Sequence, residues 1–121
     1  MRDIEFRGLS NSGEWVYGSY VSYYEGYHAI HCQIEPEDDF NNHLVDGQSV
    51  GQYTGLKDCN CTKIFEGDII SALDEVSAVY FSDGSFCVGI GHLHIIKINQ
   101  QYLVNCGFVV IGNIHQNSDL L

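Results

Sequence analysis

Basic residues are scarce in this 121-residue chain, in which five lysines and arginines face 16 aspartates and glutamates for a formal charge of −11. Proteins that bind nucleic acid through a broad face neutralise phosphates with cations, and this sequence has few to offer. We therefore expect no direct nucleic-acid binding. Acidity of this kind commonly serves solubility. An alternative is that the protein is an acidic DNA-mimic decoy that occupies a basic site on a partner protein.

Long hydrophobic runs are also absent from the sequence. No run approaches the roughly 20 apolar residues that a membrane-spanning helix needs, so we expect no membrane association. The N-terminal segment MRDIEFRGLSNS is charged from its second residue and lacks the apolar centre of a secretory signal. We therefore expect a cytoplasmic protein. Hydrophobic residues still make up 45% of the chain, enough to build the core of one compact domain.

The cysteines do not form the regular pattern of a disulfide framework, because they are odd in number and widely scattered. They are Cys32, Cys59, Cys61, Cys87 and Cys106. We expect free thiols, mostly buried as small hydrophobic side chains. The sequence also lacks a recognisable Cys/His nucleophile pattern and a phosphate-binding loop. We therefore expect a protein that is not an enzyme, and we assign no catalytic and no cofactor-binding residue.

The Cys59-Asn60-Cys61 triplet raises the question of a metal site. One residue separates these cysteines, whereas structural zinc knuckles usually have two to four. A tetrahedral site would need a second pair of ligands. His92 and His94 are candidates, because residues two apart on a strand point to the same face. We assign no metal ligand, and metal binding or metal sensing through these cysteines and histidines is kept as an alternative function.

Strand patterns dominate the rest of the chain. Short apolar or alternating runs between turn residues predict strands over 4–8, 14–21, 28–34, 50–56, 63–70, 75–81, 85–91, 93–98, 102–105 and 108–115. The pair Asp83-Gly84 is a strong hairpin signal, and Gly67-Asp68 predicts a tight turn. The single proline lies in the acidic loop 35–39, and we expect one short helical turn over Phe40–Leu44.

This pattern predicts an all-β fold. Residues 50–121 are expected to form a small SH3-like, partly open β-barrel. Residues 1–49 are expected to form an N-terminal β-meander with the acidic loop. We predict that both parts belong to a single domain over residues 1–121.

Aromatic residues are concentrated near the N-terminus. Five tyrosines follow Trp15 within a short stretch, at Tyr17, Tyr20, Tyr23, Tyr24 and Tyr27. Tyrosine combines a large apolar area with a polar tip, which suits protein interfaces. Stacking on single-stranded bases normally requires a cationic groove as well. We expect part of this cluster to lie in the core and the rest to form a subunit or partner interface.

Several blocks of the sequence resemble the YopX-like family of phage and prophage proteins. They are the segments MRDIEFRG, EWVYG, VGQYTGLKD, KIFEGDII and VIGNIHQNSDLL, and they follow the order in which the family carries them. The resemblance implies a small, mainly β, oligomeric protein encoded by a phage or prophage. It therefore implies the cytoplasm of a bacterial host. It brings no established activity, cofactor or catalytic residue.

The resemblance also bears on the cysteine triplet. Between the GLKD and IFEGD segments, relatives usually carry Lys, then Asn-Gly, where this chain has Cys59, Asn60 and Cys61. Asn-Gly at that place implies a type I′ hairpin turn, in which both central residues have a positive φ. A cysteine in place of glycine must adopt this geometry at a cost of roughly 1 kcal/mol or change the turn type.

These observations lead to one main hypothesis on function. We expect a non-enzymatic accessory protein of a phage or prophage that binds an unknown host or phage protein through an oligomeric β scaffold. Partner identity, stage of the phage cycle and subunit number are outside what the sequence specifies.

Overall fold

The computed structural model describes residues 4–22, 26–31, 42–72, 75–82, 84–90, 94–97 and 107–121. Antiparallel strands dominate these residues, which confirms the expected all-β fold. The chain divides into two compact units, residues 1–53 (unit 1) and residues 54–121 (unit 2). In the described part of the chain, no helix is long and apolar enough to cross a membrane.

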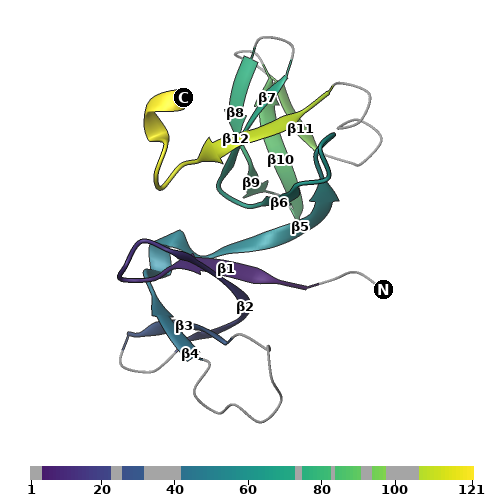
Figure 1. Cartoon of the computed structure of the whole chain (residues 1–121). Helices are drawn as coiled ribbons and strands as arrows, with labels where there is room; N and C mark the ends of the chain where they lie inside the picture. Colours follow the sequence, from purple (N-terminus) through teal and green to yellow (C-terminus); the bar gives the residue numbers. More distant parts are fainter. Residues whose placement is uncertain are drawn as a thin grey trace. The chain divides into compact units, whose positions relative to one another are not determined.

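Unit 1 is an antiparallel meander (Figure 1). Its elements are β1 (Phe6–Leu9), β2 (Trp15–Ser22), β3 (His28–His31), β4 (Asn42–Val45), the 3₁₀ helix η1 (Gly47–Ser49) and the first half of β5 (Gly51–Lys57). The strands lie in the order β4-β3-β2-β1-β5. Strand alternation places Val16 and Tyr20 on the face that packs against the buried Ile30 and Val45. This arrangement confirms the expected N-terminal meander.

The helical turn expected over Phe40–Leu44 is wrong for the described residues of that segment. Asn42–Val45 forms β4, which pairs antiparallel with β3 in the register His28↔Val45 and Ile30↔His43. Pairing with β3 satisfies the backbone groups of this segment and buries Val45. Helical structure begins only after Asp46, whose carboxylate accepts the backbone N–H of Gln48 at 3.0 Å.

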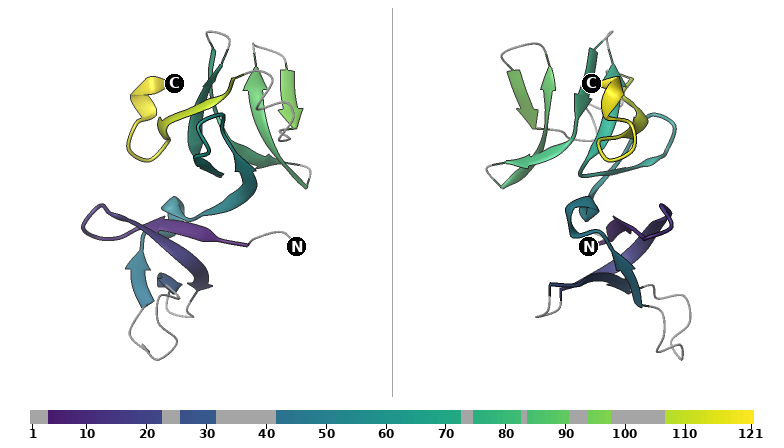
Figure 2. Two further views of the ribbon diagram at one scale, coloured as in Figure 1. Left: turned by 45° about the vertical axis from the view of Figure 1, so that its right-hand side comes forward. Right: turned by 90° about the vertical axis from the view of Figure 1, so that its left-hand side faces the viewer.

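Unit 2 is built from short strands that surround a second core (Figure 2). After the second half of β5 come β6 (Lys63–Phe65), β7 (Asp68–Ala72), β8 (Glu75–Ala78), β9 (Tyr80–Ser82), β10 (Ser85–Ile90), β11 (His94–Lys97), β12 (Val109–Asn113) and the 3₁₀ helix η2 (Ser118–Leu120). Two three-stranded sheets have the orders β12-β7-β8 and β11-β10-β9, and β5 pairs with β6. The buried side chains are Ile64, Ile70, Val79, Val88 and Phe108. The expected partly open barrel is confirmed.

The run 75–81, expected as one strand, is divided at Val79. This residue is almost fully buried, and its backbone groups bond to Gly67 and Asp68 at 2.9 and 2.8 Å. The residues before it pair with β7 and those after it pair with β10, so one apolar run serves two sheets. The hairpin expected at Asp83-Gly84 is confirmed by the pairing Ser82↔Ser85. The strand expected over 102–105 lies outside the described residues.

Candidate functional site

The sheet of unit 1 has a second face, opposite its core. Alternation along β1, β2 and β4 places Trp15, Tyr17, Val21 and Leu44 on this face, which we call the Tyr17 face. Tyr17 is 45% exposed and Leu44 is 52% exposed. A large aromatic and a large aliphatic side chain are therefore left open to solvent on one sheet.

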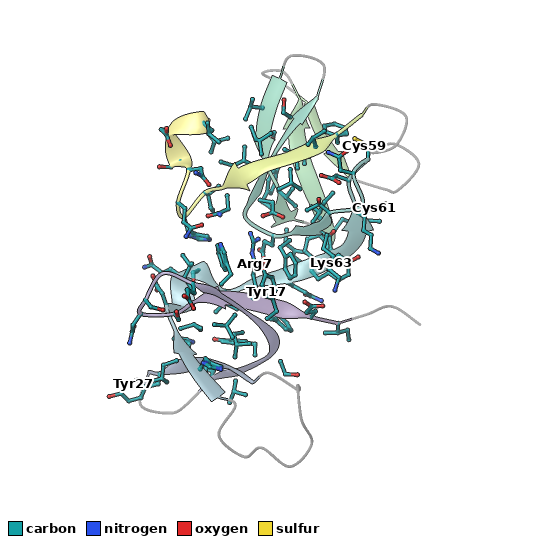
Figure 3. All side chains as sticks on the ribbon, viewed as in Figure 1. Arg7, Tyr17, Tyr27, Cys59, Cys61 and Lys63 are labelled. Carbon is teal, nitrogen blue, oxygen red and sulfur yellow. The ribbon has the colours of Figure 1, made fainter. Side chains whose placement is uncertain are left out.

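Arg7 organises the β1 side of the Tyr17 face. It pairs in register with Tyr17, and its guanidinium carbon lies 4.2 Å from the centroid of the Trp15 ring (Figure 3). The residue is 6% exposed. A guanidinium over an indole face is attracted by the ring quadrupole, which holds the Trp15 ring against Arg7. Arg7 was not identified from the sequence as a residue of this surface.

The tyrosines near the N-terminus divide between the core and the surface. Tyr20 packs against the unit 1 core, and its hydroxyl forms a 2.6 Å hydrogen bond with Nδ1 of His28. Tyr17 and Tyr27 are exposed, whereas Tyr23 and Tyr24 lie outside the described residues. The division between core and surface agrees with the expectation from the sequence, and the interface role stays a prediction.

A hollow of about 520 Å³ lies at one end of the unit 1 sheet. Tyr27, Leu44 and Asp46 line it together with His28, whose ring lies directly over Gly47. A Cβ atom at position 47 would lie 2.4 Å from Cδ2 of His28, so a larger residue there would force the His28 ring to move. The sequence signal for this site is the Asp46-Gly47 pair.

The cysteine triplet forms the loop of the β5–β6 hairpin. The backbone N–H of Cys61 donates to the carbonyl of Asp58 at 3.0 Å, and the N–H of Asp58 donates to the carbonyl of Thr62 at 2.9 Å. Cys61 has φ 64°, and it is the one non-glycine residue with a positive φ among those described. This is a three-residue loop, a type I turn followed by a bulge at a left-handed residue. Of the two alternatives left open by the sequence, the turn type changes: Asn60 does not have a positive φ, so the type I′ turn implied by the resemblance is not formed.

Asp58 accounts for the loop geometry. Its buried carboxylate accepts the backbone N–H groups of Asn60 and Thr62 at 2.8 and 2.9 Å through Oδ1, and that of Val110 at 2.9 Å through Oδ2. A side-chain acceptor two residues before the turn residue Asn60 favours an Asx-type turn over a type I′ turn. An aspartate directly before a turn is the sequence signal that would have identified this role.

The EGDI segment also has a structural role. Gly67 has φ 92°, and its carbonyl accepts the N–H of Ile114 at 2.9 Å. The buried carboxylate of Asp68 accepts the N–H of Phe65 at 2.7 Å. The glycine and the aspartate therefore close the turn between β6 and β7 and attach it to the segment after β12.

The VIGN segment, at the end of β12, closes the last turn of the chain. Asn113 Oδ1 accepts the N–H groups of His115 and Gln116, each at 3.0 Å. A Cβ atom at Gly112 would lie 2.7 Å from Oδ1 of Asn117. The GLKD, EGDI and VIGN segments therefore converge on β12, where they hold unit 2 together.

The chain was compared with protein families, curated proteins and solved structures. The model of the family described as YopX protein matches residues 5–121. The chain belongs to the YopX family. The chain also has the fold of a solved structure, the crystal structure of protein EF1440 from Enterococcus faecalis. The two are 23% identical, with a TM-score of 0.67, and the match covers 100% of this chain and 99% of that one. Among curated proteins, none matches.

The candidate metal ligands are not assembled within the described part of this YopX protein. There, no group of three or more histidine, cysteine, aspartate or glutamate residues could hold an ion. Cys59 and Cys61 are exposed free thiols. His92 lies outside the described residues, and for His94 only the backbone, in β11, is described. A metal site on these four residues stays a prediction that elemental analysis for zinc would test.

Proposed function

We propose that this YopX protein is a non-enzymatic accessory protein of a phage or prophage that binds another protein through the Tyr17 face, on an oligomeric scaffold. The observation that carries the proposal is the exposure of Tyr17 and Leu44 on the same side of the unit 1 sheet. Tyr17 lies beside Arg7 of β1 and Leu44 beside Ala29 of β3, so they are two separate anchor points on this side of the sheet. Aromatic anchors contribute much of the energy of protein interfaces.

The apolar area that Tyr17 and Leu44 leave exposed would contribute moderately to the free energy of binding. Burying a whole Leu or aromatic side chain stabilises by roughly 1.5–3 kcal/mol. Tyr17 and Leu44 are each about half exposed, so covering both contributes about 2 kcal/mol, more than a tenfold change in affinity. The Arg7–Trp15 contact holds an aromatic side chain of this face in place, which reduces the entropy lost on binding.

The test is affinity capture from lysogenic or infected bacterial lysate, with sedimentation measurements on the purified protein. Tyr17→Ser/Leu44→Ser is expected to weaken capture of the partner, or self-association, about tenfold or more. Phe81→Ser is the matched control, because Phe81 is 53% exposed on a strand of unit 2. Equal binding by both variants would exclude the Tyr17 face. A monomer that captures nothing would exclude the proposed function.

The acidic-decoy function is a second candidate, favoured by the charge of −11. A decoy occupies the DNA site of its partner, so the two ligands must compete. A captured partner that binds DNA and this protein at the same time would exclude the decoy function, while leaving binding through the Tyr17 face intact.

A further inference from the structure

The loop of the β5–β6 hairpin presents two thiols on one rigid turn. Cys59 and Cys61 are both exposed, and neither is engaged in a disulfide. Figure 3 labels both residues, and Lys63, on this hairpin. The third described cysteine, Cys87, is buried in β10. The two loop thiols therefore differ from it in their access to small molecules.

The backbone holds these two cysteines at a spacing that a disulfide can bridge. Residues on either side of one helical or type I turn residue have Cα atoms about 5.5 Å apart, within the usual disulfide range. Asn60 is such a residue, because it lies at the second central position of the turn and does not have a positive φ. The carboxylate of Asp58 holds the N–H groups of Asn60 and Thr62, so the loop cannot easily extend and separate the cysteines.

The surroundings of the loop favour an anionic reagent. Lys57 lies two residues before Cys59, and Lys63 lies two residues after Cys61. These are two of only five basic residues in a chain of charge −11, and both are exposed. Two of the five basic residues therefore flank the thiols, next to the carboxylate of Asp58, and they lower the repulsion that an anionic small molecule meets from this acidic chain.

We propose that Cys59 and Cys61 form a reversible disulfide across the loop, closed by exchange with an anionic small-molecule disulfide such as oxidised glutathione. One protein thiolate attacks the small disulfide, forms a mixed disulfide and releases one small thiolate. The second protein thiolate attacks the protein sulfur of that bond and releases the other. Two protein thiols are oxidised to one disulfide, the small disulfide is reduced to two thiols, and these take up the two protons. The small ring is strained, so reduced small thiols reopen it readily.

The chain offers a direct way to read this reaction. Trypsin cleaves after Lys57 and Lys63, which releases the peptide DCNCTK with both loop cysteines and no other. The full protein is equilibrated in oxidised and reduced glutathione, and the remaining thiols are blocked with N-ethylmaleimide. The protein is then digested with trypsin, and the peptide masses are measured by mass spectrometry. We expect the peptide to change from two maleimide adducts to none, with a mass two hydrogens lower than the dithiol. The closing step is intramolecular and releases glutathione, so lowering the reduced glutathione concentration is expected to favour the closed form over the mixed disulfide.

Two variants complete the experiment. Cys61→Ser keeps one thiol and is expected to accumulate the glutathione adduct on Cys59, which shows that exchange reaches the loop. Asp58→Asn is expected to raise the mixed-disulfide fraction, because the loop loses acceptors that hold it closed. Three results for the wild-type peptide would overturn the proposal. The peptide could keep its glutathione adducts, or form a disulfide with another cysteine. It could also keep both maleimide adducts under conditions that oxidise a reference dithiol. None of these results depends on a protein partner, so they are separate from the test of the Tyr17 face.

Discussion

The carboxylate of Asp58 and the backbone N–H of Val110 are joined by a 2.9 Å hydrogen bond across 52 positions of sequence. The same residue organises the β5–β6 loop, and the N–H of Cys59 donates to the carbonyl of Phe108 at 3.2 Å. One buried aspartate therefore shapes a local turn and attaches it to β12. The EGDI turn is also bonded to this part of the chain, through the pairing of β7 with β12 and the bond from Ile114 to Gly67. Hydrogen bonds from these two turns of unit 2 therefore meet at β12.

Replacing Asp58 by Asn is expected to destabilise the protein by about 2–3 kcal/mol, because the amide places a donor where the carboxylate accepted backbone N–H groups. Urea denaturation measures the change. Asp46→Asn is the control, because Asp46 is exposed and its carboxylate accepts one hydrogen bond, from the backbone N–H of Gln48. Its expected cost is below ~1 kcal/mol. Similar losses in both variants would contradict the role assigned to Asp58.

Replacing Cys61 by Gly is expected to stabilise the protein by roughly 0.5–1 kcal/mol. The left-handed conformation at φ 64° costs a residue with a Cβ atom about 1–2 kcal/mol, and glycine avoids this cost. Part of the gain is lost because glycine has more conformational freedom in the unfolded chain. Cys61→Val is expected to destabilise. The control is Cys59→Gly, which gains nothing because Cys59 does not have a positive φ. Denaturant midpoints check the order of the three variants, and equal effects of the two glycine substitutions would refute the strain at Cys61.

Replacing Gly112 by Ala is expected to cost about 1–3 kcal/mol, because its Cβ atom would lie 2.7 Å from Oδ1 of Asn117. Asn117 would have to move, and it accepts the N–H of Asn113 at 3.2 Å. Thermal unfolding of Gly112→Ala, Asn117→Ala and the double variant forms a cycle. We expect the double variant to lose less than the sum of the single losses. Additive losses would mean that the two side chains do not compete for this space.

Replacing Tyr20 by Phe is expected to cost about 1 kcal/mol, because the ring keeps its place in the unit 1 core while the hydroxyl loses its bond to His28. Tyr27→Phe serves as the control, since Tyr27 is 56% exposed, and its expected effect is within ~0.5 kcal/mol. Chemical denaturation distinguishes the two. A neutral Tyr20→Phe would mean that the Tyr20–His28 bond contributes nothing net to folding.

The sequence by itself determined the class of the fold and several of its turns. Alternation in the segment from Trp15 to Ser22 specifies a strand with Val16 and Tyr20 on the core face, because side chains of a strand point to opposite sides in turn. Gly67 and Asp68 specify their turn through a backbone conformation that favours glycine and a side chain that accepts a nearby N–H. These features depend on neighbours within a few residues, which is why a pattern can predict them.

Only the tertiary structure decided the features that join distant segments. Asn42–Val45 is a strand because β3 offers it backbone partners, and local preference alone pointed to a helical turn. Val79 divides an apolar run because its backbone groups pair with Gly67 and Asp68. Asp58 selects the loop type of Cys61 and, through Val110, the position of β12. Each outcome depends on a hydrogen-bond partner or a buried surface that exists only after folding, so its physical cause is absent from the local sequence.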